Sequence, residues 1–163
     1  MTLLQAFRGE LVVAETPVDV AGGFLNKVAL ESAMQFEQET HHFYLELAQE
    51  CTYPAAQQVF QELALAEKEH RAVLDRIQAV HQDVLKETET ESQSPILSVD
   101  EKMQLQEKIR KAWQHEAETA KFYKALAEKV NIHSLQEVFW GLAQEEEMHH
   151  QRLFQLQKQI EES

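Results

Sequence analysis

The chain has 163 residues, the length of a single domain, and carries a formal net charge of −13 at pH 7. This charge argues against nucleic acid and anionic membrane surfaces as partners, because the chain could not neutralise their phosphates. Its single cysteine excludes an intrachain disulfide and any metal site built on several cysteines. Since the sequence has no apolar run of about 18 residues and no secretory signal at its start, we expect a soluble, cytoplasmic protein.

Residues 1–22 differ in character from the rest of the chain. They contain a short apolar stretch, Leu11 to Ala14, which could form a strand, and Pro17 would interrupt any helix that began before it. We interpret residues 1–22 as an N-terminal arm that packs on the body of the protein or on a second copy. Residues 23–163 form the main domain.

The main domain is predicted to be all-α. The segment 86–98 is polar and lacks apolar periodicity, so we interpret it as a connection. The turns before and after it are short, which makes their flanking helices antiparallel neighbours. Two helical hairpins joined by a longer crossover are typical of a ferritin-like four-helix bundle. The apolar spacing predicts helices over about residues 23–50, 54–85, 99–130 and 134–160.

Two capping boxes are predicted to open the later helices. Ser98 is followed by Glu101, and Ser134 by Glu137. Pro54 suits the first turn of the second helix, where its missing N–H costs nothing.

The two hairpins are copies of one unit, because residues 33–78 align with residues 112–157 without a gap. The identical positions are not confined to the apolar ones. Each copy contains a Glu, a Tyr seven residues later, and a Glu-x-x-His. The repeated pairs are Glu37 and Glu116, Tyr44 and Tyr123, Glu67 and Glu146, and His70 and His149.

This spacing predicts a metal site inside the bundle. Residues seven apart share one face of a helix, and residues three apart are neighbours that can bind one ion. Four carboxylates and two imidazoles buried together would be strongly destabilising unless cations were present, and two divalent ions remove the conflict. Oxygen-rich ligands with two imidazoles suit iron or manganese. The set matches the pattern of ferritin-like di-iron proteins.

Each residue of the repeat has an expected role. Glu67 and Glu146 would bridge the two metals. Glu37 and Glu116 would each bind one ion, as would His70 and His149. Tyr44 and Tyr123 would donate hydrogen bonds to carboxylate oxygens of the opposite hairpin.

Other interpretations compete with this one. A lone Glu-x-x-His in a Glu-rich helix is usually solvated, and Glu147 with His150 forms a second such motif. The repeat decides between the registers, because Glu146 aligns with Glu67 and His149 with His70. The remaining histidines have no repeat partner and are predicted to be surface or rim groups: His41, His42, His81, His115, His133 and His150.

With these motifs the chain resembles the rubrerythrin branch of the ferritin-like superfamily over residues 24–160. The resemblance implies a non-haem di-iron centre that reacts with hydrogen peroxide or dioxygen. Rubrerythrins proper also carry a rubredoxin domain with four cysteines, which Cys51 alone cannot provide. Peroxidase-type members have a further Glu ligand one turn after the third-helix Glu, where this chain has Thr119 and Ala120. The site is therefore predicted to be symmetric, which weakens a peroxidase assignment.

Three functions remain open from the sequence. The first is a di-iron oxidoreductase that reduces peroxide or dioxygen with electrons from an external donor protein. The second is ferroxidation with iron storage or delivery, in which the negative charge would attract cations. The third is a structural metal-binding bundle. Iron storage would predict a shell-like oligomer or a partner compartment, and otherwise we expect a homodimer.

Overall fold

The computed structural model describes residues 20–81 and 104–162, with side chains from Leu25 onward. The N-terminal arm up to residue 19 and the connection with the Ser98–Glu101 capping box lie outside the described residues. No helix in the described part of the chain is both long enough and apolar enough to cross a membrane. The described residues form four helices, which are α2 (Val20–Glu50), α3 (Pro54–Val80), α4 (Leu105–Lys129) and α5 (His133–Glu161).

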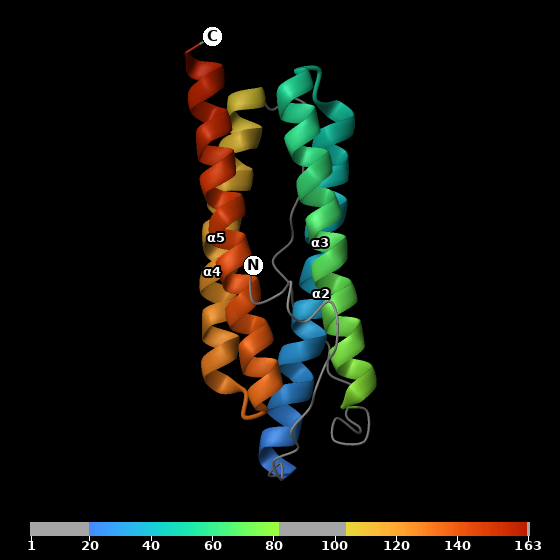
Figure 1. Cartoon of the computed structure of the whole chain (residues 1–163). Coiled ribbons are helices and arrows are strands. Elements are labelled where there is room, and N and C mark those ends of the chain that lie inside the picture. The colour runs from blue at the N-terminus through green and yellow to red at the C-terminus, as the bar shows by residue number, and fades with distance from the viewer. Residues whose placement is uncertain (1–19, 82–103, 163) are drawn as a thin grey trace.

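The helices form two antiparallel hairpins that lie side by side (Figure 1). Helix α2 packs along α3, and α4 packs along α5. Pro54 is the first residue of α3, at the position where its lack of an N–H is harmless. The predicted all-α bundle of two helical hairpins is thus confirmed.

One capping prediction is wrong. Helix α5 begins at His133, one residue before the expected start, and its N-cap is Ile132, which makes no side-chain capping bond. Ser134 therefore lies inside the first turn. Its Oγ lies 3.2 Å from Nε2 of His81 at the end of α3, so this hydroxyl joins two helices instead of capping one.

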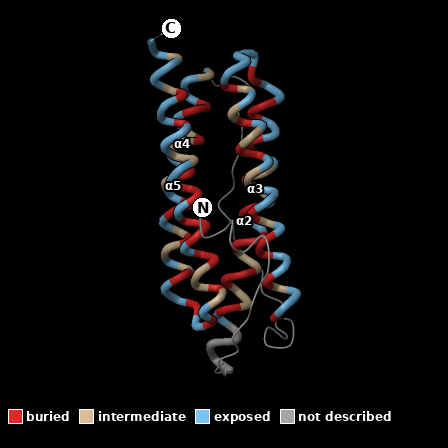
Figure 2. Tube along the Cα trace, viewed as in Figure 1, coloured by how far each residue is buried: buried red, intermediate tan, exposed pale blue. Residues whose placement is uncertain are grey.

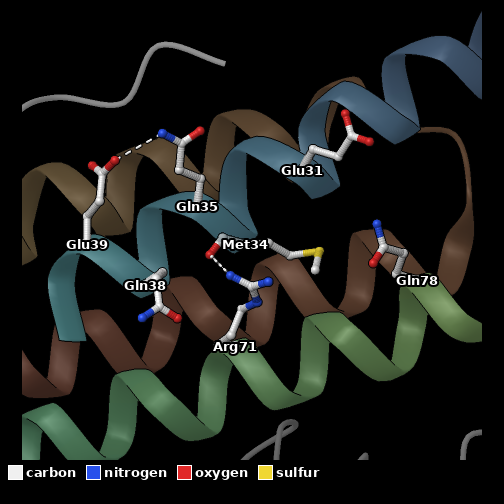
Figure 3. A pocket seen from close by; sticks show the side chains of 7 residues that line it. All are labelled: Glu31, Met34, Gln35, Gln38, Glu39, Arg71 and Gln78. Carbon is white, nitrogen blue, oxygen red and sulfur yellow. Dashed lines mark hydrogen bonds between the residues drawn. The ribbon is translucent and has the colours of Figure 1, made fainter. Parts of the chain in front are cut away.

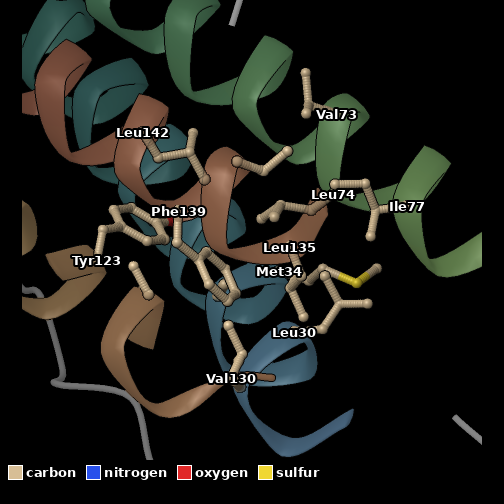
Figure 4. Close-up of a cluster of buried hydrophobic side chains, with 14 of the residues drawn as sticks. Leu30, Met34, Val73, Leu74, Ile77, Tyr123, Val130, Leu135, Phe139 and Leu142 are labelled. Atoms are coloured by element: carbon tan, nitrogen blue, oxygen red, sulfur yellow. The ribbon is translucent and has the colours of Figure 1, made fainter. Parts of the chain in front are cut away.

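The buried faces of all four helices point between the hairpins, and the exposed faces point outward (Figure 2). The apolar side chains form two clusters, one toward each end of the bundle. Figure 4 shows the cluster that joins the start of α2 and the end of α3 to the α4–α5 turn. It is built around Leu30, Leu74, Ile77, Leu135 and Phe139. The opposite cluster is built around Leu47, Phe60, Leu63, Ile109 and Leu153.

Polar contacts connect the two hairpins at their ends. Asn26 of α2 donates to Oδ1 of Asn131 at 2.5 Å, and its own Oδ1 accepts the backbone N–H of Asn131 at 3.0 Å. At the other end, Nζ of the buried Lys108 donates to Glu50 at 2.6 Å. Since each bond joins one hairpin to the other, these contacts fix how the hairpins are aligned along the bundle axis.

Candidate metal centre

Six repeated acidic and histidine residues meet halfway along the bundle, between the two apolar clusters. Each of the four helices contributes to the group. Five of the six are at most 1% exposed, although all are polar. Burying so many ionisable side chains together destabilises the fold unless their charges are neutralised. The six residues are Glu37 of α2, Glu67 and His70 of α3, Glu116 of α4, and Glu146 and His149 of α5.

The six residues divide into two overlapping groups of four. Within each group, one potential ligand atom from every residue lies within 4.8 Å of the others. Glu67 and Glu146 belong to both groups, which suits carboxylates that bridge two ions, whereas the other four belong to one group each. The first group is Glu37, Glu67, His70 and Glu146; the second is Glu67, Glu116, Glu146 and His149.

Both imidazoles turn the same nitrogen toward the carboxylates. His70 Nδ1 lies 3.2 Å from Glu146 and 3.4 Å from Glu67. His149 Nδ1 lies 3.1 Å from Glu146 and 3.4 Å from Glu67. The two rings are stacked with their centroids 5.5 Å apart and an interplanar angle of 13°. Two nitrogens therefore face one pair of shared carboxylates from opposite halves of the repeat.

The unpaired atoms of the centre fit a pair of cations. A buried polar atom without a hydrogen-bond partner is costly, and such atoms are rare in proteins. Among the described residues, five of the six such side-chain atoms lie at the centre, the sixth being Trp113 Nε1. The five are four carboxylate oxygens and one imidazole nitrogen, which are the atoms of a metal-ligand set. The atoms are Glu37 Oε2, Glu67 Oε1, His70 Nδ1, Glu116 Oε2 and Glu146 Oε1.

Without cations the carboxylates compete for protons. Burial, with the neighbouring charge of Glu67, raises the pKa of Glu37 to about 8. Burial and the charge of Glu116 raise the pKa of Glu146 to about 7. Burial would also raise the pKa of Glu116, but hydrogen bonds with His149 and Glu146 outweigh it and lower that pKa to about 2. The centre thus binds positive charge as protons when no metal is bound.

Two tyrosines cross from each hairpin to the other, as the sequence predicted. Tyr44 of α2 donates to Glu116 Oε1 of α4, and Tyr123 of α4 donates to Glu37 Oε1 of α2. Burial and the adjacent carboxylates raise the pKa of both hydroxyls well above the ordinary value, so both stay protonated and continue to donate. Each bond leaves the second oxygen of its glutamate directed at the centre.

The turn after Glu116 supplies no carboxylate to the centre, because its Glu118 is exposed. Thr119 is buried there, and its hydroxyl donates to the backbone carbonyl of His115 at 2.9 Å. Thr40, its repeat partner, donates to the carbonyl of Phe36 at 3.0 Å. Both threonine hydroxyls therefore donate to the backbone of their own helix, and the ligand set keeps the symmetry of the repeat.

Glu145 also contacts the centre, although the sequence pattern did not predict it. This residue is 8% exposed, and its Oε2 lies 3.0 Å from Nε2 of His70. A carboxylate only accepts, so Nε2 carries a hydrogen, and Nδ1 is the ring nitrogen that remains to bind an ion at the centre. The repeat could not reveal Glu145, because the aligned residue is Ala66. Its position immediately before Glu146, in a run of three glutamates, was the available signal.

Two of the histidines that were predicted to lie at the surface are buried. His115 is 5% exposed, stacks on Phe36 with ring centroids 5.2 Å apart, and lies 3.1 Å from Thr40 Oγ1. Burial lowers the pKa of His115, which favours the neutral ring. His81 is 7% exposed beside Ser134. Both lie where a helix of one hairpin meets the other hairpin, a contact that the spacing within one helix does not reveal.

A surface hollow of about 380 Å³ lies along α2 and α3 (Figure 3). It contains none of the six residues of the centre. Arg71 extends across it and donates to the backbone carbonyl of Met34 at 2.8 Å. In the other hairpin, Nδ1 of His150 lies 2.9 Å from the carbonyl of Trp113, the aligned pair of residues. The hollow therefore belongs to the joint between two helices rather than to the centre. Its lining is Glu31, Met34, Gln35, Gln38, Glu39, Arg71 and Gln78.

Comparison with known proteins gives one family. The Rubrerythrin family model matches residues 28–109 and residues 107–163, which together make up most of the chain. The two matched segments include all six residues of the centre. Searches of curated proteins and of solved structures gave no match.

Proposed function

The chain belongs to the rubrerythrin family, and we propose that it is a di-iron oxidoreductase that reduces hydrogen peroxide or dioxygen at the carboxylate and histidine centre. The observation that carries this proposal is the gathering of unpaired acceptor atoms from all four helices into two overlapping ligand groups. A structural role alone would not require so many buried acceptors to converge, because two hairpins can be held together by apolar packing.

Six residues would hold the ions. Glu67 and Glu146 would bridge them, since both lie in each ligand group. Glu37 with His70 would complete one position, and Glu116 with His149 the other. Two ferrous ions bound there would each supply one electron to the oxidant.

The chain's own residues prepare the centre for this chemistry. Tyr44 and Tyr123 keep their protons and hold one oxygen of Glu116 and Glu37, respectively. Phe60 and Phe139 stack beside the two tyrosines, with ring centroids 6.3 and 5.9 Å away. Both phenylalanines are fully buried, so they exclude water from the two ends of the centre.

The proposal is tested by a single turnover. Protein loaded with iron and reduced without oxygen is mixed with a limiting amount of hydrogen peroxide or dioxygen. Oxidation of two irons for each peroxide consumed, at a rate well above that of free ferrous iron, is the expected result. Iron that is bound as a pair but is inert to both oxidants would contradict the oxidoreductase and favour a structural centre.

A second candidate is ferroxidation, with iron as the substrate. It is favoured by the turn of Thr119 and Ala120, which lacks the additional glutamate of peroxidase-type members. The net charge of −13 would also draw cations toward the protein. Under this alternative, oxidised iron leaves the centre and further ferrous iron replaces it. Consumption of many irons per chain without an electron donor would distinguish it from the first proposal.

Electrons for repeated turnover would come from a separate donor protein. The chain has one cysteine, Cys51, which is buried at the end of α2, so it cannot form the four-cysteine iron site of a rubredoxin domain. We also propose a homodimer, to be tested by measuring the mass of the protein in solution.

A further inference from the structure

The two histidines of the centre are held differently. His70 is fixed at both ring nitrogens: Nδ1 faces the carboxylates of the centre and Nε2 donates to Glu145 at 3.0 Å. Within the part of the chain that the structure describes, the contacts of His149 with carboxylates run through Nδ1. The position that would correspond to Glu145 in the repeat is Ala66, whose methyl group cannot accept a hydrogen bond.

Solvent reaches the two histidines differently as well. The side chain of His70 is 1% exposed, whereas that of His149 is 13% exposed. Ala66 is itself partly exposed. The His149 side is therefore the open side of the centre.

We propose that Glu145 is a positioning residue that makes the two metal positions unequal, so that the position of His70 binds an ion first and more tightly than the position of His149. This inference rests on the proposed function, since it presumes that the centre binds two ions. It concerns the order and strength of binding, which the symmetric ligand set alone would make equal.

Two physical effects act in the same direction. A carboxylate that accepts the N–H of a metal-binding imidazole fixes the ring and makes its other nitrogen more basic, and removal of such a partner typically costs about 10–100-fold in metal affinity. Glu145 also adds a fourth carboxylate near the His70 position, beyond Glu37, Glu67 and Glu146. We therefore expect the two dissociation constants to differ by about 10–100-fold.

The test is a titration of the metal-free protein with cobalt(II), which is followed by visible absorption and by metal analysis after dialysis. The wild-type chain should bind two cobalt ions in two resolved steps. His149→Ala should keep the tighter step and lose the weaker one, whereas His70→Ala should lose the tighter step. These two variants assign the steps to the two positions.

Exchanging the residues of the repeat then tests Glu145 itself. Glu145→Ala gives the His70 side the alanine of the His149 side, and should weaken only the tighter step by about 10–100-fold. Ala66→Glu makes the reverse change at a partly exposed position, and should strengthen the weaker step. Glu145→Gln retains the shape but not the charge, and should fall between alanine and wild type.

Helical content, measured by circular dichroism, controls for misfolding of Glu145→Ala, and the glutamine and Ala66→Glu variants carry the test if that variant unfolds. Two equal binding steps in the wild type would overturn the inference and leave the proposed function standing. The same holds if the ratio of the two dissociation constants is unchanged in Glu145→Ala, Glu145→Gln and Ala66→Glu. A chain that binds no cobalt and no iron would overturn both.

Discussion

The α2–α3 hairpin and the α4–α5 hairpin place the same side chains at the same depth in the bundle. Each provides a glutamate, a tyrosine that donates to the glutamate of the other hairpin, and a Glu-x-x-His. Around this shared set the hairpins differ: Ala66 is matched by Glu145, and Phe36 by His115.

The difference separates two kinds of position. Repeated residues form bonds between the hairpins, because Tyr44 and Tyr123 each donate to a glutamate of the other hairpin. A change in only one copy would leave a buried group of the other copy unpaired. The unmatched residues adjust the surroundings of one half only, as Glu145 does for His70. Symmetry thus builds the centre, and departures from symmetry make its halves different.

The largest expected effect comes from breaking the shared part of the centre. Glu67→Ala removes a residue that belongs to both ligand groups, so we expect paired metal binding to be abolished. Glu146→Ala should have the same effect, because the repeat gives it the same place. Metal content per folded chain checks both variants. Two ions retained in either one would refute its bridging role.

The next effect concerns pH in the protein without metal. The pKa values of Glu37 and Glu146 are raised to about 8 and about 7, from 4.5, so the folded state holds their protons more tightly than the unfolded state. Their stabilising contribution is complete below pH 4.5 and is lost as the pH rises through 7 and 8. The imidazoles of His70 and His149 act in the same direction, because their pKa values are raised as well. A tenfold difference in proton affinity between the folded and unfolded states corresponds to about 1.4 kcal/mol.

Thermal unfolding between pH 5 and pH 8, with and without metal, measures this effect. The metal-free protein should lose stability toward pH 8, and the loaded protein should not, since metal replaces the protons. Below pH 4.5 the lowered pKa of Glu116 acts in the opposite sense and reduces stability as the pH falls toward 2. A metal-free protein that becomes more stable between pH 5 and pH 8 would contradict this expectation.

A smaller effect tests whether the two halves are equivalent. Tyr44→Phe and Tyr123→Phe each leave one buried glutamate oxygen without its donor, so each should cost about 1–3 kcal/mol. Urea unfolding of the loaded protein measures the loss. Tyr53→Phe, at an exposed tyrosine, is the control and should change stability by less than about 0.5 kcal/mol. A large loss in one variant and none in the other would show that the crossed bonds are not equivalent.

The smallest effect on metal binding is expected at the second Glu-x-x-His motif, Glu147 with His150. Glu147 is exposed and pairs with Lys124, and His150 stacks on Trp113 with ring centroids 4.9 Å apart. Glu147→Ala and His150→Ala should therefore keep their full metal content. Loss of one metal in either variant would mean that the second Glu-x-x-His is the ligand pair.

The sequence was sufficient for the fold and for the six repeated residues of the centre, because both depend on features that occur twice. Helical spacing and the aligned copies predict two hairpins, and the shared Glu-x-x-His motifs select Glu146 over Glu147. The same criterion discards whatever occurs once. Glu145 was missed for this reason, and His81 and His115 were wrongly placed at the surface, since the partners of all three lie on other helices. The capping box at Ser134 failed because a contact with His81 competes for the same hydroxyl.

We propose that six residues from four helices hold a pair of ions. X-ray absorption of the iron-loaded protein, combined with iron analysis, would show such a pair. We expect two irons per chain, a second iron within about 4 Å of each, and nitrogen and oxygen atoms as the ligands. Iron without a neighbouring iron, or less than one iron per folded chain, would contradict the claim.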